Sequence, residues 1–330
     1  MKKAAVALAV LIGLSSGSAL AATVYSADGT ELKIGGRVEF RGDFIGTSKG
    51  AEIEGSMDDS TRARVNLKGK SQVTDSLIAF GVYEAEQDTG DSQFENRYMY
   101  AGVEGDFGAV SFGRQDMASV IVSDMTDITE FSGVQQVIGA ASDKENSVFK
   151  YAADIDALQL QATYQTSSDK DKDGYGLSGL YSLPVGLDLG LAFSGADLGM
   201  DAGRASDILF GLGFTLDKLY LASTYSFGDL DDKASGTNDK EFTAMEFVVQ
   251  YQFTKEFSAA ALYTRQENEK ADKSKYDELE GVELIGYYKF NSNFRTYLSY
   301  YLNELDEEKE STGLVTAGED TLRLGVRYDF

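Results

Sequence analysis

The sequence contains no cysteine, no histidine and no tryptophan, and its only proline is Pro184. Without cysteine the chain cannot form disulfide bonds. Without cysteine and histidine it cannot build the usual serine or cysteine catalytic triads, or metal sites with histidine ligands. A pair of carboxylates could still catalyse hydrolysis, but no segment suggests a substrate cleft of that kind. We therefore expect no enzyme, no cofactor and no metal site.

Long apolar runs are absent after the first residues. Residues 1–21 are typical of a secretory signal peptide, because two lysines precede the apolar stretch Ala4–Leu14 and Ala19-Leu20-Ala21 is a small-x-small cleavage site. The apolar stretch is too short for a membrane anchor, and no later run approaches the roughly 18 residues that a transmembrane helix needs. The sequence thus predicts a cleaved signal peptide, residues 1–21, and an exported chain, residues 22–330.

Basic residues are scarce beside acidic ones. The chain has 30 Lys and Arg against 54 Asp and Glu, a formal charge of −24, and loss of Lys2 and Lys3 with the signal peptide makes it −26. Such a surface repels nucleic acid, so no nucleic-acid partner is expected. The acidic excess is concentrated in polar segments that resemble loops, which favours an exposed acidic loop surface.

Strict alternation of apolar and polar residues is the main positive signal. In the last segment, the residues of one parity are Leu322, Leu324, Val326, Tyr328 and Phe330, and those of the other include Arg323, Arg327 and Asp329. Successive side chains of a strand point to opposite faces, so this strand has one apolar and one charged face. An apolar edge strand invites aggregation in water, whereas a closed barrel in a bilayer has no free edge.

The same alternation recurs along the chain and gives about 16 strands with short and long connections in turn. The long connections are expected near 46–60, 87–93, 116–143, 167–174, 195–205, 228–240, 266–279 and 304–318. Short periplasmic turns and long extracellular loops are typical of outer-membrane barrels. The prediction is an all-β, 16-stranded antiparallel transmembrane β-barrel, which is wide enough for an aqueous channel.

Four stretches carry a family resemblance: Tyr25–Arg37, Thr61–Gly69, Asn96–Arg114 and Gly325–Phe330. In their order and spacing they resemble the trimeric general-diffusion porins of Gram-negative outer membranes, most closely the OmpU-type subgroup. The match covers essentially the whole mature chain. It implies a homotrimer in the outer membrane through which small hydrophilic solutes and ions diffuse. It also implies contact with outer-membrane lipid and lipopolysaccharide, and recognition of Tyr328 and Phe330 by the barrel-assembly machinery.

In that family the third long loop folds into the barrel and narrows it. Here the corresponding loop is 116–143, which resembles the family pattern around Thr126–Gly133 but lacks its proline and its final Gly-Asp. The resemblance implies a constriction with an acidic loop and a basic wall: Asp124, Asp127 and Glu130 on the loop, and Arg37, Arg64, Arg97 and, with looser alignment, Lys144 on the wall.

Alternation independently places the three arginines on the lumen face. Acidic side chains on an infolded loop would oppose them and create a transverse field in the channel. The residues alone leave open whether the acidic segment instead caps an exterior loop. Because Arg327 and Asp329 lie near the chain end, we expect them toward the periplasmic mouth, with the selective chemistry in the first half of the chain.

Two other functions stay open: a barrel with a closed channel that serves mainly as an adhesin or structural protein, and a substrate-specific channel. The net charge predicts mild cation selectivity, although the basic wall opposes it.

Asp169–Gly174 matches the first half of a calcium loop, but Leu180 stands where the bidentate Glu should be. Gly174, Gly176 and Gly179 have dinucleotide-fingerprint spacing without the required strand and helix, so we expect strand glycines. The acidic segment 303–310 is a solvated loop or a bridge to lipopolysaccharide through divalent cations.

Overall fold

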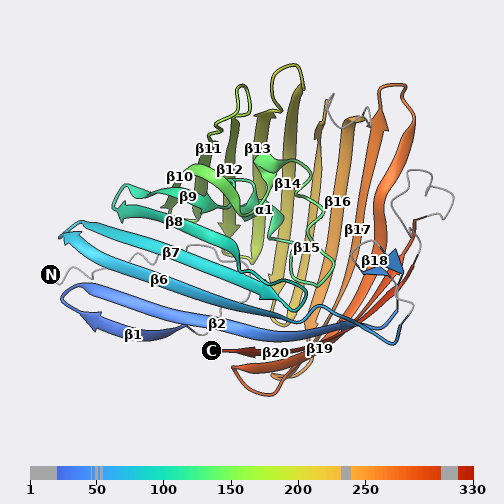
Figure 1. Ribbon diagram of the computed structural model, residues 1–330, viewed down its shortest axis with the longest axis horizontal. Coiled ribbons are helices and arrows are strands. Elements are labelled where there is room, and N and C mark those ends of the chain that lie inside the picture. Colours follow the sequence, from blue (N-terminus) through green and yellow to red (C-terminus); the bar gives the residue numbers. More distant parts are fainter. Residues whose placement is uncertain (1–20, 46, 49–50, 53–54, 232–238, 306–318) are drawn as a thin grey trace.

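The computed structural model describes residues 21–45, 47–48, 51–52, 55–231, 239–305 and 319–330, and they form a closed antiparallel β-barrel (Figure 1). Sixteen long strands make the wall: β2 (Thr30–Asp43), β6 (Arg62–Thr74), β7 (Leu77–Asp88), β8 (Glu95–Gly105), β9 (Gly108–Gln115), β10 (Glu145–Ile155), β11 (Leu158–Gln165), β12 (Gly174–Leu183), β13 (Leu187–Asp197), β14 (Arg204–Leu216), β15 (Leu219–Asp229), β16 (Asp239–Gln252), β17 (Phe257–Lys270), β18 (Lys275–Lys289), β19 (Phe294–Asn303) and β20 (Thr321–Asp329). The predicted strand number is confirmed.

Short elements accompany the wall. β1 (Ala22–Ala27) pairs with the start of β2, and β5 (Asp58–Asp59) pairs with its end. β3 (Thr47–Ser48) and β4 (Ala51–Glu52) pair with each other. The connection between β9 and β10 contains α1 (Val120–Ser123) and the 3-10 turn η1 (Gly139–Ala141). In the part of the chain described here, no helix is long and apolar enough to cross a membrane.

The barrel closes where the first long strand meets the last. β2 pairs with β20 from Arg37 opposite Asp329 to Asp43 opposite Arg323. At the end of this seam the N–H of Gly36 donates to the carbonyl of Phe330, and the N–H of Phe330 donates to the carbonyl of Gly36, both over 3.0 Å. The predicted closure by the terminal strands is confirmed, and it leaves the long strands without an open edge.

The two faces of the wall differ as the alternation predicts. Leu191, Phe247 and Leu298 are 53%, 48% and 54% exposed on the outer surface, whereas Glu246 beside Phe247 is only 1% exposed. Apolar side chains turned outward suit the hydrocarbon of a bilayer, and polar side chains turned inward suit a water-filled lumen. Gly174, Gly176 and Gly179 lie in β12, so their reading as strand glycines is confirmed.

The connections alternate in length, with one correction. The predicted long loop at 266–279 is wrong, because only residues 271–274 separate β17 from β18. Cross-strand ion pairs hold these polar strands together: Arg265 lies 2.8 Å from Asp277, and Lys275 lies 2.8 Å from Glu267. Oppositely charged residues that pair across two strands stabilise a hairpin. A polar segment can therefore continue the strands instead of forming a loop.

Several sequence-based predictions concern residues that the structure does not describe. The signal peptide lies outside the described residues except for Ala21, and most of the acidic segment 303–310 does as well. Cleavage after residue 21 and bridging by the segment 303–310 therefore stay predictions.

Candidate functional site: a charged cavity in the lumen

The connection 116–144 runs along the inner face of the wall. Figure 1 shows α1 on the inner side of the ring, and α1 contacts β12, β13 and β14. Val122 and Met125 pack against buried side chains of the wall, which are Ala192, Leu209, Ala222, Val248 and Leu262. Gly211 of β14 makes room for this contact, because a Cβ there would lie 2.5 Å from Sδ of Met125. Apolar packing therefore fixes the first part of the loop against the barrel.

Two buried carboxylates of the wall hold the middle of the loop. Oε1 of Glu246 on β16 accepts hydrogen bonds from the N–H groups of Gly133 and Val134, at 2.7 and 3.2 Å, and Oε2 accepts one from the hydroxyl of Thr126 at 2.6 Å. Glu283 on β18 accepts hydrogen bonds from two N–H groups slightly earlier in the loop, those of Glu130 at 3.2 Å and Phe131 at 3.0 Å. These contacts give partners to backbone donors of half-buried loop residues.

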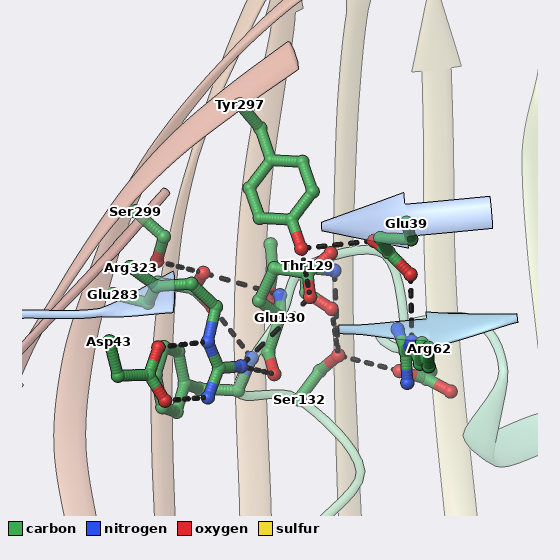
Figure 2. A network of polar contacts seen from close by, with 12 residues as sticks. Glu39, Asp43, Arg62, Thr129, Glu130, Ser132, Glu283, Tyr297, Ser299 and Arg323 are labelled. Atoms are coloured by element: carbon green, nitrogen blue, oxygen red, sulfur yellow. Dashed lines mark hydrogen bonds and ion pairs between the residues drawn. The ribbon is translucent and has the colours of Figure 1, made fainter. Parts of the chain in front are cut away.

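The loop segment around Glu130 reaches β19 and β20. The ring of Phe131 stacks on that of Tyr301 with a centroid distance of 4.7 Å, and the guanidinium of Arg323 lies 4.3 Å above Phe131. Arg323 also forms a two-point ion pair with Asp43. Figure 2 shows Glu130 between Tyr297 and Arg323. The loop thus bridges from the β12–β16 side of the lumen to the seam at β20.

Beside this loop the lumen contains a cavity of about 700 Å³. All seven residues predicted for the constriction line it: Arg37, Arg64, Arg97, Lys144, Asp124, Asp127 and Glu130. The structure therefore brings together side chains from β2, β6, β8 and the loop that are far apart in the sequence. Charges of both signs face the same space, so the geometry for a transverse field is present.

The arginines nevertheless pair with wall carboxylates rather than with the loop. Among the described residues, none of Arg37, Arg64 and Arg97 has an ion pair within 4.0 Å to the loop acids. Arg64 pairs with Glu86. Arg97 lies 2.8 Å from Glu84 and 3.2 Å from Glu86, and Arg37 lies 3.6 Å from Glu39. Lys144 pairs with its neighbour Asp143. The wall is therefore partly neutralised by its own acidic residues.

The acidic loop residues have other partners. The hydroxyl of Tyr297 donates to Oε1 of Glu39 at 3.0 Å and lies 3.1 Å from Oε2 of Glu130. The hydroxyl of Ser132 donates to Asp127 at 2.6 Å. Burial raises the pKa of Asp127 above its ordinary value, and the hydrogen bond from Ser132 opposes this shift.

Several cavity residues were missed at the sequence level. They are Arg41, Arg62, Glu39, Tyr297, Arg295 and Arg327. The alternation of β2 already placed Glu39 and Arg41 on the face of Arg37, so these two carried a detectable signal. The expectation that Arg327 lies away from the constriction residues is wrong, because Arg327 lines the same cavity and stands opposite Glu39. The charged lining therefore comes from both halves of the chain.

The two residues predicted as an assembly signal lie on the outer surface of the seam. Tyr328 is 50% exposed and Phe330 is 39% exposed. The ring of Phe330 covers Gly36, where a Cβ would lie 2.7 Å from its Cζ. Their position is compatible with recognition from outside the barrel, and that role stays a prediction.

Comparisons with known proteins agree with the fold. A model of the Gram-negative porin family matches residues 4–329. Outer membrane protein U of Vibrio vulnificus is 30% identical, with both chains fully covered. The structure is similar to OmpF of Salmonella typhi in complex with daunomycin, with a TM-score of 0.81 and 22% identity over 94% of this chain and 100% of that chain. It also resembles the trimer form of OmpT of Vibrio cholerae, with a TM-score of 0.73 and 18% identity over 92% and 100%. The chain therefore belongs to the Gram-negative porin family and is a general-diffusion porin of the outer membrane.

Proposed function

We propose that small hydrophilic solutes and ions cross this barrel through the charged cavity, and that loop 116–143 sets the size limit. The observation that carries the proposal is the cavity of about 700 Å³ between the anchored loop and the arginine-rich wall. Asp124, Asp127 and Glu130 on the loop, and Arg37, Arg64, Arg97 and Lys144 on the wall, are proposed to set solute preference. Polar groups facing a narrow aqueous passage orient dipolar solutes and hinder apolar ones.

Planar bilayer recordings test this proposal. The purified, folded protein is expected to insert in discrete conductance steps in KCl. A folded preparation without steps would instead support a closed barrel that acts as an adhesin or structural protein. Liposome swelling with sugars of graded size tests the second alternative, because a general pore sorts sugars by size, whereas a substrate-specific channel favours one sugar irrespective of size.

We also propose that the barrel assembles as a homotrimer embedded in outer-membrane lipid and lipopolysaccharide, and that it has no catalytic activity. The trimer form recorded for the structurally similar OmpT supports the first part. The second part is supported by the match to the Gram-negative porin family and by a relative named as a porin, OmpD of Citrobacter koseri. Light scattering of the detergent-solubilised protein, corrected for bound detergent, is expected to give three times the mass of one chain. We further propose that the barrel-assembly machinery recognises Tyr328 and Phe330 when it inserts the barrel into the outer membrane.

Lowering the pH is expected to shift ion selectivity through Asp127. Since burial raises the pKa of this carboxyl, it takes up a proton at a higher pH than an ordinary Asp, whose pKa is about 3.9. Protonation removes one negative charge from the cavity, so the zero-current potential in a KCl gradient should move toward the anion side as the pH falls from 7. Asp127→Asn should show this shift already at pH 7 and a smaller change on acidification. Identical pH profiles of the two proteins would contradict the assignment.

A further inference from the structure

Six arginines gather on the lumen face of four adjacent strands at the seam, and we call them the arginine patch: Arg295 of β19, Arg327 of β20, Arg37 and Arg41 of β2, and Arg62 and Arg64 of β6. Arg295 stands directly opposite Arg327, and Arg37 directly opposite Arg64. Side chains opposite each other on paired strands have Cβ atoms about 5 Å apart. The patch is therefore continuous across the seam.

Carboxylates do not balance the patch. Glu39 serves two arginines, with Nε of Arg62 at 2.7 Å and a terminal nitrogen of Arg37 at 3.6 Å. Asp329 pairs with Arg327 at 2.6 Å. Glu86 pairs with Arg64, but it also pairs with Arg97 outside the patch. Three carboxylates thus form ion pairs with four of the six guanidinium groups, and Glu86 is shared with Arg97. Glu130 of the loop adds a further negative charge near Arg41 and Arg62, which still leaves the patch with more positive than negative groups.

Two of the six arginines have no ion pair among the described residues. Two Nε atoms of the patch also lack a hydrogen-bond acceptor there. Arg41 and Arg295 form no contact within 4.0 Å to a carboxylate in the described part of the chain. The Nε atoms of Arg37 and Arg41 are buried without a hydrogen-bond partner. Arg37 is only 6% exposed, yet it lines the cavity. Arg37 and Arg41 both line the cavity, so a solute there meets guanidinium groups whose donors are not all used by acceptors of the described residues.

The cavity also differs in sign from the protein as a whole. Nine of the residues that line it are Lys or Arg and five are Asp or Glu, whereas the chain carries a net charge of −24. The exposed loops and the cavity therefore favour opposite ions. Within the cavity, low-dielectric walls strengthen the local charges over the screened charges of the mouths.

We propose that the arginine patch binds the phosphate group of small anionic solutes, inorganic phosphate or phosphate monoesters, during their passage. The guanidinium fork matches the geometry of phosphate oxygens and donates two parallel hydrogen bonds to them. Phosphate is multivalent, so one group can contact several arginines of the patch, which a chloride ion cannot do with the same geometry. The cavity then prefers anions, opposite to the cation preference expected from net charge. This inference rests on the proposed channel function.

Phosphate titration in planar bilayers tests the proposal. Single channels are recorded in 1 M KCl, where the Debye length is about 3 Å and only local contacts act. Inorganic phosphate is expected to reduce the chloride-carried current in a saturable way. Arg41→Gln and Arg295→Gln should each weaken the apparent phosphate affinity about tenfold, since each removes a charge-assisted hydrogen-bond donor to phosphate.

Lys33→Gln is the matched control. Lys33 lies on β2 with the same parity as Arg37, about 13 Å away along the strand, and it pairs with Glu31 at 3.1 Å. This variant removes the same charge outside the patch and should keep the phosphate affinity of the unmodified protein. An absence of phosphate block in the unmodified protein, or equal losses in all three variants, would overturn the proposal. Neither result removes the KCl steps themselves, so the channel function is judged separately.

Discussion

Replacing Glu246 and Glu283 together by leucine is expected to free the loop from the wall and to raise single-channel conductance at least about twofold, because the narrowest cross-section limits ion flow. Together the two carboxylates accept hydrogen bonds from four backbone N–H groups of the loop, those of Glu130, Phe131, Gly133 and Val134. Leucine offers no acceptor at either place.

The size of the effect follows from the number of orphaned donors. A buried N–H group left without a partner costs up to about 1–3 kcal/mol, and the four half-buried groups here are unfavourable against an apolar side chain. The loop is then expected to leave the wall and hydrate its backbone. The packing of Val122 and Met125 against Leu209 and Val248 still holds the first part of the loop. Among the described residues, the segment around Glu130 has no such apolar cluster beneath it, although it keeps contacts with Tyr297, Tyr301 and Arg323, so it should move most.

Glutamine replacements separate the anchors from their charge. Glu246→Gln with Glu283→Gln removes the same two negative charges as the leucine pair but retains a side-chain oxygen at each position. At Glu283 the N–H groups of Glu130 and Phe131 bind different oxygens, so glutamine keeps one of these two acceptors. We therefore expect the conductance of this variant to stay much closer to that of the unmodified protein than the conductance of the leucine pair does. If the leucine and glutamine pairs give the same conductance, lumen charge rather than anchoring determines the current, and the loop is held by other contacts.

The architecture was predictable because the period of a strand is visible in the residues themselves. Alternation assigns each side chain to a face without knowledge of its neighbours, so Arg37, Arg64 and Arg97 could be placed in the lumen from sequence. The same argument predicted the closing seam. It failed at 266–279, where polar residues look like a loop in the sequence but pair across strands through Arg265.

The pattern of pairing inside the lumen could not be predicted in the same way. Strands of a barrel are staggered, so distance from the chain end does not fix height in the pore, and Arg327 comes to lie opposite Glu39. Alternation also assigns a side chain to one face of its strand but does not identify its ion-pair partner. The pairing of Arg64 with Glu86 could therefore not be predicted. The anchors were hidden for a further reason, because Glu246 binds backbone groups that carry no residue-specific signal.

Gly36→Val is expected to prevent formation of a stable barrel. A Cβ at this position would lie 2.3 Å from the carbonyl oxygen of Arg64 and 2.7 Å from Cζ of Phe330. The first of these atoms belongs to the backbone of β6, which cannot move without breaking its pairing with β2. Glycine in a strand marks this kind of close approach, and overpacking typically costs about 1–3 kcal/mol where side chains can adjust. Here the cost also falls on the seam, because Gly36 exchanges two hydrogen bonds with Phe330.

Refolding into detergent, followed by electrophoresis with and without heating, measures the fraction of closed barrel for each variant. Gly69→Val on β6 is the matched control, since no heavy atom lies within 4 Å of a Cβ built there. It should refold as the unmodified protein does. Phe330→Ala keeps the backbone of the seam and removes only the ring over Gly36, so it should lower barrel stability without abolishing closure. Equal refolding of the Gly36 and Gly69 variants would show that barrel closure tolerates a side chain at the crowded position 36. The other paired residues of β2 and β20 would then hold the seam.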